Sequence, residues 1–243
     1  MPVVRPAARQ AAIAARRSPV AAAMVALLMA GLLPKGLARG DVTAPNHLVI
    51  SEVVTGGASA SDELIEIHNP TASSLPLDGL ELIYVTASGA TISRRAAWGL
   101  DAGSIQPHGH LLTANEAGIY AAVADATYAS GMASTGGSVA IRIQGATMAI
   151  DAVGWGTTTS TWREGAPAAA PAAGSSIERL PGGALGSSQD TDDNAADYVV
   201  RVLPEPQNLA SPPTPMGGPA GTPWPTPLPT PAVETPAPTM VEG

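Results

Sequence analysis

The chain has 243 residues, of which 45% are apolar, and it contains no Cys and no Phe. The absence of Cys excludes disulfide bonds, thiolate metal ligands and a cysteine nucleophile. The formal charge of −8 at pH 7 argues against nucleic acid as a partner, because affinity for polyanions comes mainly from Lys and Arg that neutralise phosphates.

Residues 1–38 have the pattern of a secretory signal peptide. Four Arg precede an apolar run at 20–33, and small residues follow it. A membrane-spanning helix needs about 20 apolar residues, so the run indicates a signal helix, and a membrane contact only where that segment stays uncleaved. From residue 41 onward the chain holds 6 Arg, no Lys and 20 acidic residues, a formal charge of −14. We therefore expect a secreted or cell-surface protein that does not bind nucleic acid.

A polar lead-in segment at 39–46 precedes a predicted domain at 47–208. Short segments with alternating or continuous apolar residues predict strands, and Gly, Pro, Asn and Asp mark the turns between them. Such segments are found at 47–54, 63–69, 79–86, 110–114, 138–143, 149–155, 176–180 and 198–203. About eight short strands with little helical periodicity predict an all-β sandwich.

The first two strands illustrate the expected alternation. In the first, Ile50, Glu52 and Val54 are predicted to share one face of the strand. In the second, Ile65 and Ile67 are predicted to point inward, with the polar residues between them pointing outward. One buried face per strand is what a two-layer sandwich requires.

Three segments depart from the strand pattern. Residues 115–126 have helical spacing, which predicts a short helical turn. Residues 157–174 have no periodicity and are rich in Ala and Pro, so we expect an exposed excursion, the kind of loop on which binding surfaces are usually built. Residues 209–243 are rich in Pro and Thr and predict a disordered, extended stalk, because Pro lacks the amide donor that a sheet needs.

Seven short motifs occur in a fixed order along the predicted domain. They are VISEV (49–53), ELIEIHNP (63–70), LDGLEL (77–82), MAIDAVGWG (148–156), SSIERLPGG (175–183), DTDDNAADY (190–198) and PEPQN (204–208). Together they resemble the lamin-tail domain, and the resemblance covers about residues 47–208. It implies an immunoglobulin-like β-sandwich of the type found in secreted bacterial proteins, where such domains are often fused to hydrolases. Tyr198 stands where the pattern usually has Phe.

Glu52, Glu66 and Arg179 occupy positions at which the lamin-tail pattern carries the same residue types. A catalytic reading would make the two Glu an acid and base pair, but catalysis also needs a cleft and an oriented partner. We therefore predict a structural role in which one or both Glu pair with Arg179 across neighbouring strands.

Asp190, Asp192 and Asn194 alternate in the way that opens an oxygen-rich Ca²⁺ loop. The continuation differs, because Ala195 and Arg201 stand where such a loop has Gly and a bidentate Glu. The three residues are weak Ca²⁺ candidates, and no other cofactor is expected. Short Asp and Asn side chains also close turns, which is the alternative reading.

Other polar and aromatic residues have a structural and a functional reading. His108 and His110 flank a Gly after a Pro, and we read them as a solvated turn because no third metal ligand lies nearby in the sequence. Trp162 and Arg163 lie in the excursion and are candidate ligand contacts, whereas packing of Trp162 over the edge of the sandwich is the alternative.

The sequence favours a non-catalytic module that binds or tethers to a cell-surface polymer or protein. It shows none of the common nucleophile triads, phosphate loops or zinc-helix motifs. The alternative is an accessory domain of a secreted hydrolase, a nuclease or phosphatase, whose catalytic part lies outside this chain.

Overall fold

A computed structural model of the protein describes residues 45–214, so the predicted signal peptide and the stalk from residue 215 lie outside the described residues. The strands are β1 (Val49–Thr55), β2 (Glu63–His68), β3 (Leu75–Pro76), β4 (Leu80–Thr86), β5 (Ile92–Ala97), β6 (Ser104–Ile105), β7 (His110–Asn115), β8 (Ala126–Tyr128), β9 (Gly136–Ile143), β10 (Asp151–Gly156), β11 (Ser176–Arg179) and β12 (Tyr198–Arg201). The helical turns are η1 (Ile119–Val123), η2 (Gly183–Leu185) and α2 (Asn194–Asp197). The all-β prediction is confirmed.

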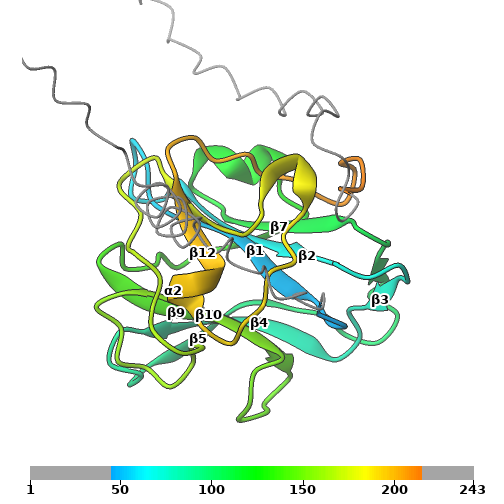
Figure 1. Cartoon of the computed structure of the whole chain (residues 1–243), viewed down its shortest axis with the longest axis horizontal. Helices are drawn as coiled ribbons and strands as arrows, with labels where there is room; N and C mark the ends of the chain where they lie inside the picture. The colour runs from blue at the N-terminus through cyan, green and yellow to red at the C-terminus, as the bar shows by residue number, and fades with distance from the viewer. Residues whose placement is uncertain (1–44, 215–243) are drawn as a thin grey trace, which may run out of the picture. The chain divides into compact units, whose positions relative to one another are not determined.

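Two sheets form the body of the domain (Figure 1). The larger has six strands in the order β12-β11-β1-β2-β7-β8, and the smaller has four in the order β10-β9-β4-β5. Neighbouring strands are antiparallel except for β7 and β8. Strands β3 and β6 pair separately. Within residues 45–214 we find no helix that is both long enough and apolar enough to cross a membrane.

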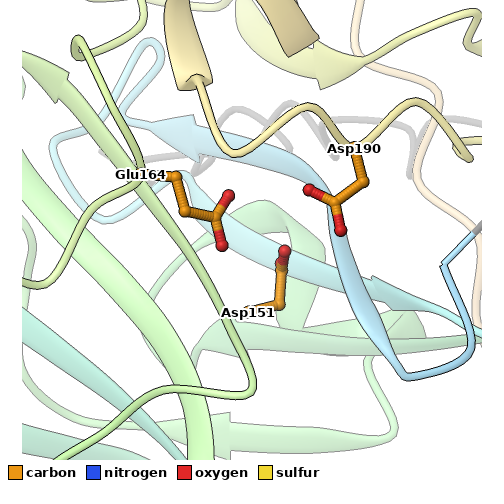
Figure 2. Close-up of side chains that lie close together, drawn as sticks. All are labelled: Asp151, Glu164 and Asp190. Carbon is orange, nitrogen blue, oxygen red and sulfur yellow. The ribbon is translucent and has the colours of Figure 1, made fainter. Parts of the chain in front are cut away.

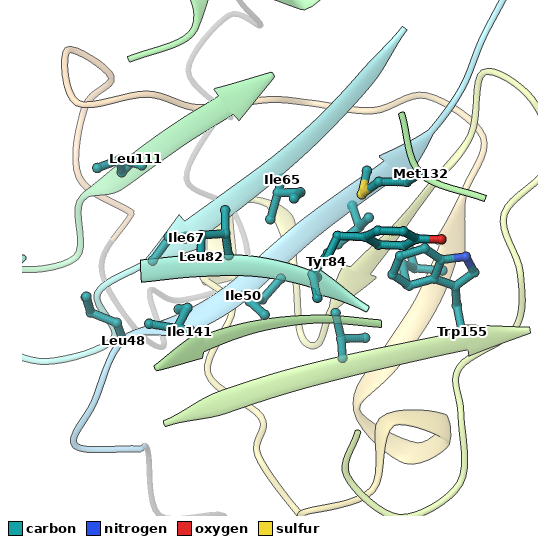
Figure 3. Close-up of a cluster of buried hydrophobic side chains, with 14 of the residues drawn as sticks. Leu48, Ile50, Ile65, Ile67, Leu82, Tyr84, Leu111, Met132, Ile141 and Trp155 are labelled. Atoms are coloured by element: carbon teal, nitrogen blue, oxygen red, sulfur yellow. The ribbon is translucent and has the colours of Figure 1, made fainter. Parts of the chain in front are cut away.

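The main core lies between the two sheets (Figure 3). Ile50 and Ile65 enter it from the larger sheet, and Leu82, Ile141 and Trp155 enter it from the smaller one. The chain has no Phe, so aliphatic side chains fill most of this space, with the Tyr84 and Trp155 rings 6.1 Å apart at one end. Apolar burial from both layers is the main force that holds the sheets together.

A β-bulge alters the face pattern predicted for β1. The register with β2 shifts between Ile50 and Glu52. Ile50 and Val53 therefore both enter the core, whereas Val54 joins a second apolar cluster. The prediction that Ile50 shares a face with Glu52 and Val54 was wrong, because a bulge inserts one residue and reverses the alternation beyond it.

The other sequence-predicted features are placed as follows. Ile65 and Ile67 point into the core, as predicted. The helical turn predicted at 115–126 is the five-residue η1, which packs against the outer face of the six-stranded sheet. Strand β5 was not predicted, because its ISRRAA sequence has neither alternation nor an apolar run.

The segment 204–214, which we call the strap, crosses the outer face of the six-stranded sheet. Its backbone N–H groups at Glu205 and Gln207 donate to Glu52 and Glu66, and the N–H of Thr214 donates to the His108 carbonyl over 2.8 Å. The structure thus differs from the predicted boundary at 208, since residues 209–214 lie on the domain and both Ser211 and Thr214 are buried.

Candidate functional site

Arg179 forms the centre of a buried charge cluster. Its side chain is fully buried, and Nη2 donates to Asp151 Oδ1 over 2.5 Å while Nη1 donates to Asp190 Oδ1 over 3.3 Å. Glu164 Oε2 lies 4.0 Å from Nη2. Figure 2 shows the three carboxylates converging from separate segments. Together they more than offset the burial of the guanidinium and raise the pKa of Arg179, so it carries a permanent charge.

Arg179 also connects the cluster to the strands. Its Nε donates to the Ile50 carbonyl over 3.0 Å, and its guanidinium lies 4.8 Å from the centre of the Tyr198 ring. The Tyr198 hydroxyl donates to the same carbonyl over 2.6 Å. The hydroxyl that distinguishes Tyr198 from the expected Phe is therefore satisfied.

The predicted pairing of Arg179 with Glu52 or Glu66 was wrong. Glu178, not Arg179, stands opposite Glu52 in the β1–β11 register. Successive residues of a strand point to opposite faces, so Arg179 points away from the glutamates and towards Asp151. The structural role that we predicted for Arg179 has Asp151 as its partner.

The acidic group around Arg179 has the composition of a metal site. One oxygen from each of Asp151, Glu164 and Asp190 lies within 4.8 Å of the others. However, the guanidinium already contacts all three carboxylates. A divalent cation there would face a fixed positive charge, so these residues do not fit a metal. Burial, then repulsion from Asp151, raises the pKa of Glu164 to about 8, which limits the negative charge of the group.

The three Ca²⁺ candidates are used in other ways. Asp190 bonds to Arg179, and Asp192 is exposed in a left-handed turn with φ of 56°. The Asn194 amide is buried, with Oδ1 accepting from the N–H groups of Gly154 and Glu164 and Nδ2 donating to the Ala152 carbonyl. The Ca²⁺ prediction therefore finds no support, and Asn194 instead ties its loop to β10 and to the excursion.

A second polar region lies on the outer face of the six-stranded sheet. Glu178, Glu52 and Glu66 stand side by side on β11, β1 and β2, and we call them the glutamate row. Like charges directly opposite one another destabilise a sheet, so each carboxylate needs a compensating partner. Glu178 has Arg201 and the N–H of Gly183.

Glu52 and Glu66 are compensated mainly by neutral donors. Glu52 Oε1 accepts from Ser176 Oγ over 2.5 Å and from the N–H of Glu205 over 3.3 Å. Glu66 accepts from Ser51 Oγ over 2.7 Å and from the N–H of Gln207 over 2.5 Å. Burial raises the pKa of Glu66 to about 8, and burial together with the charge of Glu66 raises that of Glu52 well above its usual range.

Histidines adjoin the glutamate row beneath the strap. His110 Nδ1 lies 2.8 Å from Glu66 Oε1, its Nε2 lies 3.1 Å from Thr214 Oγ1, and its ring stacks 4.4 Å from that of His68. Burial lowers the pKa of His110 to about 3, which favours a neutral imidazole next to a protonated carboxyl. The prediction of a solvated turn was wrong for His110, because the strap covers this side chain. The sequence analysis also missed His68, which is the neighbour of His110 in the structure.

The candidate ligand contacts lie on the four-stranded sheet. Trp162 is half-buried against Ile83, Val85 and Ala140, and the guanidinium of Arg142 lies 5.0 Å from its ring centre. Arg163, also half-buried, donates to the Gly165 carbonyl within its own loop. Trp162 therefore packs on the sandwich, but over the outer face of the four-stranded sheet and not over its edge as predicted, and one part of its surface stays exposed.

Six of the seven motifs found in the sequence meet in these two clusters, and the seventh, at 77–82, supplies Leu77 and Leu82 to the core. Those at 148–156, 175–183 and 190–198 supply Asp151, Arg179 and Asp190. Those at 49–53, 63–70 and 204–208 meet at the glutamate row and the strap. Comparisons with protein-family models, with curated proteins and with solved structures found no match.

Proposed function

We propose that this protein is a non-catalytic, secreted or surface-displayed binding module built on an immunoglobulin-like sandwich of the lamin-tail type. The family assignment rests on the seven ordered motifs, and the way in which six of them meet in two clusters supports it. The Arg179 cluster and the glutamate row are both built into the contacts between strands. Most of their charged groups therefore have structural partners, and we assign polymer binding to the surface outside these two clusters.

The observation that carries the proposal is the surface formed by Trp162 and Arg142. The excursion folds back along β10, where the N–H of Ala168 donates to the Gly154 carbonyl over 2.8 Å. This places Trp162 on the sheet, and Arg142 is held beside it by Glu81 over 2.8 Å. An exposed part of an indole face, held beside a guanidinium that can donate to hydroxyl groups, suits the ring of a sugar.

The test is co-sedimentation of the full chain with purified, protein-free cell-wall polysaccharide. We expect saturable binding that Trp162→Ala weakens by about tenfold, which corresponds to the loss of one stacking contact of about 1.4 kcal/mol. Leu100→Ala is the matched control, because Leu100 is 88% exposed and lies in another loop. Equal binding by the wild type and Trp162→Ala would contradict the proposal that this surface binds the polymer, provided that the two proteins unfold at the same temperature.

A further inference from the structure

A pocket opens at the edge of the glutamate row. Its volume is about 460 Å³, within the usual range for small-molecule sites. Glu52, Glu178 and Arg201 line it from strands β1, β11 and β12, and Val202, Leu203 and Glu205 line it from the chain that follows β12. The pocket is on the six-stranded sheet, so it belongs to a different surface from Trp162.

Within the described part of the chain, Glu52 is the carboxylate of this pocket that has hydrogen bonds but no cation. It is only 4% exposed, and both of its hydrogen bonds go to Oε1. Among residues 45–214 no hydrogen bond reaches Oε2, and no Arg or His forms an ion pair with this carboxylate. A buried carboxylate without a cation is costly, and its neighbour Glu178 already holds Arg201.

Among the residues that the structure describes, the carboxylates of this pocket do not form a group that could hold a metal ion. Within residues 45–214, three acidic side chains lie close enough together to share one metal ion: Asp151, Glu164 and Asp190. Glu52 and Glu178 do not belong to this group. A bare ion would therefore have too few ligands here. An organic cation is larger and needs only one charged contact, with the rest of its surface against the pocket wall.

One side of the pocket is apolar. Val202 and Leu203 are 78% and 77% exposed, and they follow one another at its mouth. Exposed aliphatic side chains next to a buried carboxylate match a ligand with an ammonium head and an aliphatic body. We propose that this pocket binds primary amines that carry an alkyl group, with the ammonium donating to Glu52 Oε2.

This binding competes with a proton. Burial, reinforced by the charges of Glu66 and Glu178, raises the pKa of Glu52 well above its usual range. The ammonium requires the ionised carboxylate, and alkylamines stay protonated up to about the pKa of Lys, near 10.4. Affinity therefore rises with pH as the carboxyl of Glu52 ionises, for as long as the amine keeps its proton.

The experiment titrates n-butylammonium into the full chain at about pH 8.5 and follows backbone amide NMR shifts. We expect saturable shifts at Gly182 and Gly183, which line the pocket. n-Butanol has the same alkyl body without the charge and should bind at least about tenfold more weakly, since a charge-assisted contact is worth about one such factor. Calcium chloride is the third arm and should leave these shifts unchanged.

The decisive variant is Glu52→Gln, which keeps the shape and removes the charge. Because it removes a buried, unpaired charge, the variant should fold at least as stably as the wild type and should lose binding by about tenfold or more. Glu116→Gln makes the same change at an exposed position far from the pocket lining and should bind normally. Unchanged affinity in Glu52→Gln, equal binding of n-butanol, or a response to calcium alone would each overturn the proposal. None of these outcomes bears on the polysaccharide test.

Discussion

The Arg179 cluster and the glutamate row both bury carboxylates, but only the Arg179 cluster contains a fully buried cation, since the Arg201 side chain that pairs with Glu178 is 41% exposed. Asp151 has the guanidinium of Arg179 at 2.5 Å. Glu66 has a neutral imidazole, a hydroxyl and a backbone N–H. Asp151 therefore depends on a guanidinium that stays charged, whereas Glu66 depends on a bound proton. Removal of the guanidinium should have the largest effect on stability, and a rise in pH should act through Glu66 and, in the Arg179 cluster, through Glu164.

The largest expected effect comes from Arg179→Met. The substitution leaves Asp151 buried without its cation, and breaking a buried pair in this way costs about 3–5 kcal/mol. Urea unfolding of the full chain measures this loss. Arg94→Met is the control, because the Arg94 side chain is 58% exposed and its pair with Glu81 should contribute at most about 1 kcal/mol. A loss below about 1 kcal/mol for Arg179→Met would show that Asp151 does not need the guanidinium.

A second substitution separates charge from packing in the same cluster. Asp151→Asn in the Arg179→Met background removes the unpaired carboxylate while keeping its shape. We expect it to recover about 1–3 kcal/mol of the lost stability, since only a charge has been removed. If the double variant is as unstable as the single one, the Arg179 side chain contributes by its volume and not by its charge.

The strands and the residue types at the buried positions could be predicted from the sequence, but the pairing of charges could not. Arg179 and Glu52 lie in segments whose alternation is visible, and a structural role for Arg179 follows from that. Its partner Asp151 belongs to the other sheet, so the contact depends on how the two sheets pack. The bulge after Ile50 has no sequence signature of its own, and it changes which residues face the core.

The strap shows a second limit of the sequence reading. Pro-rich composition excludes regular sheet pairing, and it suggested that the chain leaves the domain after residue 208. A chain without sheet pairing can still donate single N–H groups, as Gln207 does to Glu66. The burial of His110 follows from these isolated contacts, which no periodic pattern reports.

A further prediction concerns the pH dependence of the free energy of unfolding. The pKa of Glu66 is raised to about 8, so its contribution to stability is fully present below the pKa of an unfolded Glu, about 4.3, and is lost as pH rises through 8. The pKa of His110 is lowered to about 3, so its contribution is present above about 6.5 and is lost as pH falls. Between about pH 6.5 and 8.5 only the carboxyl term changes, and urea unfolding should show stability falling by about 1–2 kcal/mol for Glu66.

Glu66→Gln tests the origin of that slope. The amide does not titrate, so the fall in stability between about pH 6.5 and 8.5 should decrease by the share of Glu66, about 1–2 kcal/mol. The remaining slope should come from other raised carboxyls such as Glu164, whose pKa is also about 8. An unchanged slope in Glu66→Gln would place the titrating group elsewhere, and a stability that rises with pH in the wild type would contradict the assignment of bound protons to this region.

The smallest effect is expected where the strap ends. Thr214→Val keeps the side-chain shape but removes the hydroxyl that lies 3.1 Å from His110 Nε2 and 3.2 Å from Gln207 Oε1. The loss of one buried hydrogen bond costs about 1 kcal/mol. Faster amide hydrogen exchange at Thr214 should accompany it, because its N–H bond to the His108 carbonyl belongs to the same contact. Thr127→Val, exposed on β8, should change stability by less than about 0.5 kcal/mol. If both variants behave alike, the strap is held by its backbone N–H groups alone and His110 does not contribute to fixing it.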